Sequence, residues 1–171
     1  GDFGGEVVSD RDLVLMRAAF ERRLHASTQP EKLIINVTYR CNNKCSFCAV
    51  GTRDQYDGDL GKQREHLAQW HARGVRLLDL DGGEPTLYEG LLPLVGYARA
   101  IGYDRVNVTT NGRRMVYKDY AAALVASGVT TLLVSIHGPD RATHAREEMV
   151  LEAFDQSTQR LRNACEARDR M

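Results

Sequence analysis

The amino-acid sequence predicts an α/β fold built on a parallel sheet, in which about four strands alternate with helices behind an N-terminal helix. Four runs rich in β-branched and apolar residues recur along the 171 residues, each followed by a turn and a segment of helical periodicity. Glycines stand where helix C-terminal caps belong, at Gly74, Gly102 and Gly128. The runs are nearly continuous in apolar character, which is typical of a sheet buried on both faces.

The first part of the chain is expected to form an extension and one helix over residues 1–30, ahead of a core over residues 31–171. The segment Asp10–Leu24 has helical periodicity, with Ser9 or Asp10 as its N-cap. Its apolar residues recur at helical spacing: Leu13, Met16, Phe20 and Leu24. Gln29 and Pro30 then end the segment.

The core is expected to alternate strands and helices. We place strands at Leu33–Thr38, Val75–Leu80, Arg105–Thr110 and Thr130–Ile136. The helices that follow them cover approximately Lys62–Arg73, Tyr88–Ile101, Tyr117–Ser127 and Glu147–Arg168. This alternation indicates parallel strands joined by right-handed crossovers. Such folds carry their chemistry at the carboxyl ends of the strands, and the unusual residues of this sequence lie there.

Composition and charge argue against several classes of protein. Lys plus Arg equals Asp plus Glu at 23 each, whereas nucleic-acid binders usually carry a basic surface, so a nucleic-acid partner is not expected. No stretch approaches the roughly 18 consecutive apolar residues that a membrane-spanning helix needs. The N-terminus lacks the basic-then-apolar pattern of a secretory signal. We therefore expect a cytoplasmic protein without a membrane partner.

The cysteines are clustered rather than spread along the chain. Three of the four lie within eight residues, directly after the first predicted strand: Cys41, Cys45 and Cys48. Their thiolates suit zinc or an iron–sulfur cluster, and the spacing alone does not separate the two. A closed zinc site needs a fourth ligand, for which His66 and His71 are candidates, whereas three ligands leave one position open. Cys165 is far away and is expected not to be a ligand.

A second motif, Asp81-Gly82-Gly83-Glu84-Pro85, ends the second predicted strand. The two glycines let a ligand approach the backbone closely, and the carboxylate of Glu84 can pair with an ammonium group. Taken alone, the motif also fits an ordinary turn between a strand and a helix.

In their order along the chain, these motifs resemble the radical S-adenosylmethionine (SAM) superfamily. The segments Thr109–Gly112 and Val134–Asp140, after the third and fourth strands, are similar to its next two landmarks, as are Thr143-His144 followed by Phe154. The resemblance covers about residues 31 to 165, the N-terminal part of the core domain. It is greatest to the branch that contains molybdenum-cofactor biosynthesis enzymes and peptide-modifying maturases.

The resemblance implies an enzyme with two cofactors. Cys41, Cys45 and Cys48 would bind three irons of a 4Fe–4S cluster, and SAM would chelate the fourth iron. An electron from the cluster would cleave SAM to methionine and a 5′-deoxyadenosyl radical, which abstracts hydrogen from a substrate. An electron donor such as flavodoxin or ferredoxin is then a partner.

The resemblance also implies which residues contact SAM. Gly82, Gly83 and Glu84 would receive the methionine amino group. The backbone at Phe47 would face the adenine, and Ser135 would lie near the ribose or the methionine part.

The substrate is less well indicated. Thr110 and Asn111 could face it, although Thr-Asn-Gly is also a common turn. His137 lies in the predicted cavity, where a turn or packing role is the alternative, and His144 is expected at the surface. The run from Ser135 to Asp140 resembles the maturase branch and favours a peptide substrate, with a nucleotide or another small metabolite as the alternative.

The sequence departs from the superfamily in length. Its barrel usually has six βα units, and only four are readable here, so we expect a partial parallel (β/α) barrel of the radical SAM type. The strand Thr130–Ile136 carries no charge or proline, so an open edge there favours self-association. Two other functions stay open: a truncated cluster-binding domain without turnover, and a zinc-stabilised binding module.

Overall fold

The computed structural model describes residues 9–26, 30–51, 55–148 and 162–170. The chain divides into two compact units, Gly1–Pro30 and Glu31–Met171. In the first unit, helix α1 spans Asp10–Ala26, two residues beyond the predicted end. The Ser9 hydroxyl accepts a hydrogen bond from the N–H of Asp12 at 3.2 Å, which makes Ser9 the cap. In the part of the chain that the structure describes, no helix combines the length and the apolar character needed to cross a bilayer.

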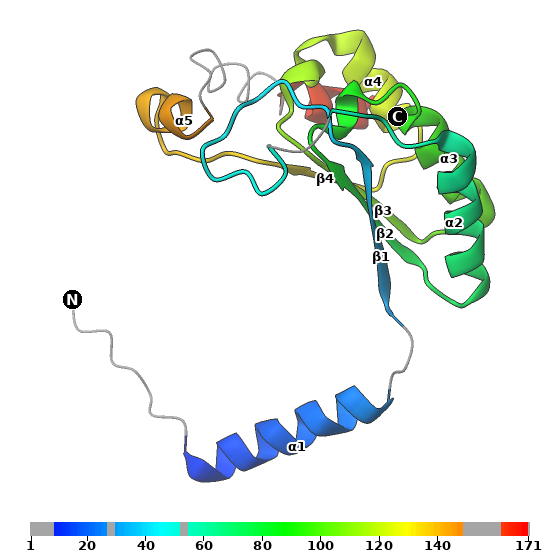
Figure 1. The fold of residues 1–171 in the computed structure, drawn as a ribbon, viewed down its shortest axis with the longest axis vertical. Coiled ribbons are helices and arrows are strands. Elements are labelled where there is room, and N and C mark those ends of the chain that lie inside the picture. Colours follow the sequence, from blue (N-terminus) through cyan, green and yellow to red (C-terminus); the bar gives the residue numbers. More distant parts are fainter. Residues whose placement is uncertain (1–8, 27–29, 52–54, 149–161, 171) are drawn as a thin grey trace. The chain divides into compact units, whose positions relative to one another are not determined.

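The second unit is built on one sheet of four parallel strands, as predicted, and the strand order in the sheet is β1-β2-β3-β4 (Figure 1). The strands are β1 Lys32–Thr38, β2 Leu77–Gly82, β3 Arg105–Thr110 and β4 Thr131–Val134. The bounds of β3 agree with those predicted. β2 begins two residues late and β4 is shorter at both ends than the sequence suggested.

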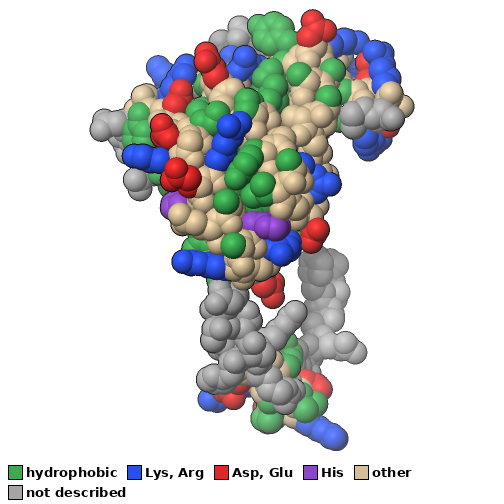
Figure 2. All heavy atoms as spheres, turned by 90° about the vertical axis from the view of Figure 1, so that its right-hand side faces the viewer, with side chains coloured by type: hydrophobic (Ala, Val, Ile, Leu, Met, Phe, Trp, Pro, Cys, Tyr) green, Lys and Arg blue, Asp and Glu red, His purple; other side chains and the backbone are tan. Residues whose placement is uncertain are grey.

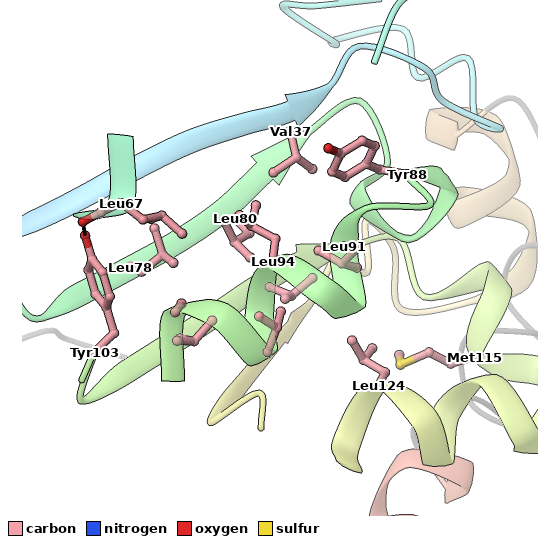
Figure 3. Close-up of a cluster of buried hydrophobic side chains, with 14 of the residues drawn as sticks. Val37, Leu67, Leu78, Leu80, Tyr88, Leu91, Leu94, Tyr103, Met115 and Leu124 are labelled. Atoms are coloured by element: carbon pink, nitrogen blue, oxygen red, sulfur yellow. Dashed lines mark hydrogen bonds between the residues drawn. The ribbon is translucent and has the colours of Figure 1, made fainter. Parts of the chain in front are cut away.

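Helices cover one face of this sheet, with α2 (Leu60–Ala72) beside α3 (Leu91–Ile101) and α4 (Lys118–Ala126) farther along (Figure 1). Apolar strand residues such as Leu78 and Leu80 are fully buried against helix residues such as Leu67 and Leu94 (Figure 3). The solvent-facing side of α2 and α3 mixes basic, acidic and apolar side chains (Figure 2).

The second face of the sheet differs from the prediction, because it is not buried throughout. Ile34 and Leu133 are 56% and 57% exposed on it. Polar residues alternate with the apolar ones along β2 and β3, at Asp79, Asp81 and Thr109. This face therefore lines the inside of the partial barrel, which takes polar side chains as well as apolar ones.

Two helix predictions need correction. The segment from Pro85 to Leu87 forms a short 3₁₀ turn, η1, so α3 begins at Leu91 instead of Tyr88. Of the helix expected over Glu147–Arg168, residues 149–161 lie outside the described residues, and 162–169 are helical.

Helix α5 spans Arg141–Glu148, so helical structure begins six residues before the start predicted at Glu147. The carboxylate of Asp140 accepts the backbone N–H of Thr143 at 2.8 Å, and this hydrogen bond lowers the pKa of Asp140. Asp140 thus caps the helix.

We predict that Tyr103→Phe lowers the free energy of unfolding by about 1 kcal/mol, because one buried hydrogen bond is lost. The Tyr103 hydroxyl donates to the Leu67 carbonyl at 3.0 Å (Figure 3), and burial raises the pKa of this phenol to about 12. Urea denaturation measures the change, with Tyr117→Phe at a 69% exposed position as the control. Equal stability of the two variants would contradict the prediction.

Candidate functional site

The loop that carries the three cysteines follows β1 and is fixed at several points. The N–H of Cys41 donates to the Gln55 side chain at 3.1 Å, and the N–H of Tyr39 donates to the Tyr56 carbonyl at 2.9 Å. Farther along, the N–H of Ser46 donates to the Glu147 carbonyl of α5 at 3.2 Å. The loop therefore reaches from the first βα unit to the fourth.

A cavity of about 320 Å³ lies at the carboxyl ends of the four strands. All the residues that the sequence nominated for the site line this cavity, except Glu84. They are Cys41, Cys45, Phe47, Cys48, Gly82, Gly83, Thr110, Asn111, Ser135 and His137. Segments nearly 100 residues apart in the chain are thus brought to one place, at the end of the sheet where parallel folds carry their chemistry.

The sequence did not nominate four further residues that line the same cavity: Asn36, Asn43, Asp81 and Thr109. Asn36 and Asp81 are register partners across β1 and β2. Oδ1 of Asp81 is buried and has no hydrogen-bond partner among the described residues. The alternation of polar and apolar residues in the strands is the sequence signal that could have identified Asn36, Asp81 and Thr109, whereas Asn43 lies in the cysteine loop, outside the strands.

A second cavity, of about 540 Å³, shares the three cysteines and Gly83 with the first. It is also lined by Tyr39, Lys44 and Gln55. The cysteine side chains, each partly buried, are therefore accessible from two spaces.

The absence of side chains at Gly82 and Gly83 lets another segment of the chain, the start of the cysteine loop, approach their backbone closely. A Cβ atom at Gly82 would collide with the carbonyl oxygen of Thr38, and one at Gly83 with that of Arg40. The N–H groups of Gly83 and Glu84 donate to these carbonyls, each at 2.8 Å. The glycines therefore join the turn after β2 to the start of the cysteine loop.

Glu84 is fully buried behind the cavity wall. Its Oε1 accepts from the N–H and the hydroxyl of Thr86, at 3.0 and 2.5 Å, and from the Thr110 hydroxyl at 2.6 Å. Its Oε2 accepts from the N–H of Asn111 at 2.7 Å. The carboxylate thus connects the turns after β2 and β3.

The protonation of Cys41 depends on its surroundings. Burial raises the pKa of this thiol, the backbone N–H of Asn43 acts in the opposite direction, and the charges of Glu84 and Cys48 raise it further. Since a metal or cluster binds the thiolate, binding at Cys41 must release a proton.

His137, which follows β4, is part of an aromatic group. The rings of Phe47 and His137 meet edge to face, with centroids 4.7 Å apart. The backbone N–H of His137 donates to Nδ1 of the His144 ring at 3.1 Å. His144 is fully buried, so the surface position expected from the sequence is wrong.

The zinc ligands considered from the sequence do not join the cysteines. Neither His66 nor His71 lines either cysteine cavity. Over the described ranges, no three His, Cys, Asp or Glu side chains are placed to hold a metal ion. The three thiols instead border a space large enough for a group of many atoms, and thiolates are the usual ligands of iron–sulfur clusters.

Comparison with known proteins identifies the family. The sequence profile of the radical SAM superfamily matches residues 35–169. The chain belongs to this superfamily. Its members bind a 4Fe–4S cluster and SAM, and the three cysteine thiols beside one cavity fit the cluster. The resemblance found in the sequence is confirmed.

The relatives include a probable GTP 3′,8-cyclase of Saccharolobus solfataricus, 33% identical over 136 residues, which are 78% of this chain and 43% of the relative. A protein of the same description from Sulfolobus acidocaldarius is 31% identical over 112 residues, 64% of this chain and 35% of the relative. The chain thus spans less than half the length of these relatives.

Solved structures share the fold. SuiB of Streptococcus suis bound to SAM has a TM-score of 0.71 at 22% identity, covering 95% of this chain and 39% of SuiB. HydG, a maturase of the FeFe-hydrogenase, has a TM-score of 0.66 at 16% identity, covering 94% of this chain and 39% of HydG. At these identities the likeness supports the partial-barrel fold alone.

We predict that Glu84→Gln lowers the free energy of unfolding by about 2 kcal/mol, because an amide group faces donors that the carboxylate accepted. The exposed Glu89→Gln is the matched control. Urea denaturation of both variants measures the difference, and a Glu84→Gln protein as stable as the control would disprove the structural role of this carboxylate.

Proposed function

We propose that this chain is part of a radical SAM enzyme in which Cys41, Cys45 and Cys48 hold a 4Fe–4S cluster and SAM binds in the cavity beside them. The observation that carries the proposal is the meeting of the three thiols with the Gly82-Gly83 turn around one cavity. When bound, the cluster supplies the electron that cleaves SAM into methionine and a 5′-deoxyadenosyl radical, which takes hydrogen from the substrate.

The residues around SAM bind and orient it. Gly82 and Gly83 present backbone to the methionine amino group, and Glu84 supports them through its hydrogen bonds to the next turn. Ser135 faces the ribose or methionine part, held by its N–H, which donates to the Thr110 carbonyl at 2.9 Å. Phe47, packed on His137, provides a wall for the adenine. Thr110, Asn111 and His137 border the space left for substrate.

We further propose a peptide side chain with a cationic group as the substrate. Among the described residues that line the cavity, the acidic side chain is Asp81, which attracts an ammonium or guanidinium group and repels a polyphosphate. SuiB, which has the same fold at a TM-score of 0.71, has been solved bound to its precursor peptide SuiA. The second candidate, a nucleoside triphosphate, is favoured by the identity with probable GTP 3′,8-cyclases.

The proposed setting is the cytoplasm, where thiols stay reduced, with flavodoxin or ferredoxin as electron donor. The edge strand β4 exposes Leu133 on the inner face of the sheet and borders, through Leu132 and Val134, an apolar groove of about 350 Å³. Self-association through this edge stays a prediction.

We predict that the protein, reconstituted anaerobically with iron and sulfide, holds roughly four irons, as expected for a 4Fe–4S cluster. Cys45→Ala is expected to lose this iron, because one of three ligands is removed. Cys165→Ala, at an exposed position, is the control and should retain it.

Iron, sulfide and zinc analysis of the three proteins measures the outcome. Stoichiometric zinc without iron would show a zinc-stabilised module. A full cluster without release of 5′-deoxyadenosine from SAM under reducing conditions would indicate a domain without turnover.

We predict that Asp81→Asn weakens the binding of Nα-acetyl-lysine amide about tenfold, the loss of one charge-assisted hydrogen bond of about 1.5 kcal/mol. The affinity for GTP should stay equal or rise. Calorimetry on the reconstituted, SAM-loaded protein measures both, with the exposed Asp104→Asn as control. Tighter binding of GTP than of the lysine derivative to the unmodified protein would favour the nucleotide.

A further inference from the structure

Arg113 lies in the turn after β3 and contacts the cysteine loop, 70 residues earlier in the chain. Its Nη1 donates to the carbonyl oxygen of Asn42 and, at 3.2 Å, to Oδ1 of Asn43. Asn111 adds a third bond from the same turn, since its Nδ2 donates to Oδ1 of Asn42 at 2.8 Å. The β3 turn therefore holds both asparagines that follow Cys41.

This contact continues to a cysteine sulfur. The backbone N–H of Asn43 donates to Sγ of Cys41 at 3.4 Å. The Asn43 residue is buried, at 9% exposure. Because Arg113 binds the carbonyl before this N–H and the side chain of the same residue, it fixes the direction in which the N–H points.

Arg113 is itself held firmly. Its N–H donates to Oδ1 of Asn111 at 2.9 Å, and the N–H of Asn111 donates to the buried Glu84 carboxylate at 2.7 Å. A left-handed Gly112, with φ of 74°, starts the 3₁₀ turn η2 (Arg113–Val116). A continuous series of hydrogen bonds thus runs from a buried carboxylate to the Cys41 sulfur.

We propose that Arg113 is a positioning residue that keeps the Asn43 N–H on the Cys41 sulfur and thereby raises the reduction potential of the cluster. The inference rests on the proposed function, which makes Cys41 a cluster ligand. Hydrogen bonds to the sulfurs of an iron–sulfur cluster set its potential, because they stabilise the more negative, reduced state. Both acceptors are bound by Nη1, whose two hydrogens point in fixed directions in the guanidinium plane, whereas the hydrogens of an ammonium rotate freely.

The test compares four reconstituted proteins: the unmodified chain, Arg113→Lys, Asn43→Ala and the double variant. Arg113→Lys keeps the charge and replaces the planar guanidinium by a freely rotating ammonium, whereas Asn43→Ala removes one acceptor of Arg113 and keeps the backbone N–H of residue 43. The matched control is Arg114→Lys, because Arg114 lies in the same turn but binds the Thr86 carbonyl and stacks on Tyr120.

The midpoint potential without SAM, followed by electron paramagnetic resonance, is the readout, with iron and sulfide content measured on each sample. Arg113→Lys and Asn43→Ala are expected to shift the reduction equilibrium toward the oxidised cluster by up to tenfold, about 59 mV for a one-electron couple. The midpoint potential of the double variant should shift by less than the sum of the two single shifts, because both substitutions break the same Arg113–Asn43 contact.

Loss of iron from Arg113→Lys and Asn43→Ala, but not from Arg114→Lys, would also support the proposal, since the loop is then no longer fixed. Unchanged potentials in both variants at full iron content would overturn it, and so would equal effects in Arg114→Lys. Failure of the proposed function is distinguishable, because the unmodified chain would then take up no iron.

Discussion

The buried carboxylate of Glu84 is the interaction on which the architecture of the site depends. A fully buried charge is unfavourable unless hydrogen bonds compensate it, and here four donors converge on its two oxygens. Two of these donors belong to Thr110, the last residue of β3, and to Asn111, which follows it, so the turns after β2 and β3 cannot separate without breaking hydrogen bonds to the buried carboxylate. Through Asn111 the same constraint extends to the loop after β1.

One face of the sheet packs in the hydrophobic core, and the other face lines the cavity. The face toward α2 and α3 carries residues such as Leu78, Leu80 and Val108, all fully buried, which supply the hydrophobic core. Residues one position away along the same strands, including Asp81 and Thr109, face the cavity. Because side chains alternate between the two faces along each strand, the core residues lie on one face and the cavity residues on the other.

Much of the fold and of the site could be predicted from the sequence, because both leave local signals. Strand-like runs with glycine caps gave the element order, and the spacing of Cys41, Cys45 and Cys48 marked the loop that lines the cavity. Long-range contacts left no such signal. The glycines at 82 and 83 meet the chain at Thr38 and Arg40, Arg113 reaches Asn42, and His144 is buried under the turn after β4. Each of these depends on segments that come together only in three dimensions.

The bond from Ser46 to Glu147 joins the cysteine loop to α5, and the Phe47–His137 contact lies beside it. The first and last strands of the sheet are consequently connected twice, once through the strands between them and once through these contacts of the cysteine loop. This closed circuit fixes the separation of the two outer strands at their carboxyl ends, and with it the curvature of the sheet. The circuit joins residues about 100 positions apart, so closing it in the unfolded chain costs loop-closure entropy, a cost that pairing of the strands between them reduces.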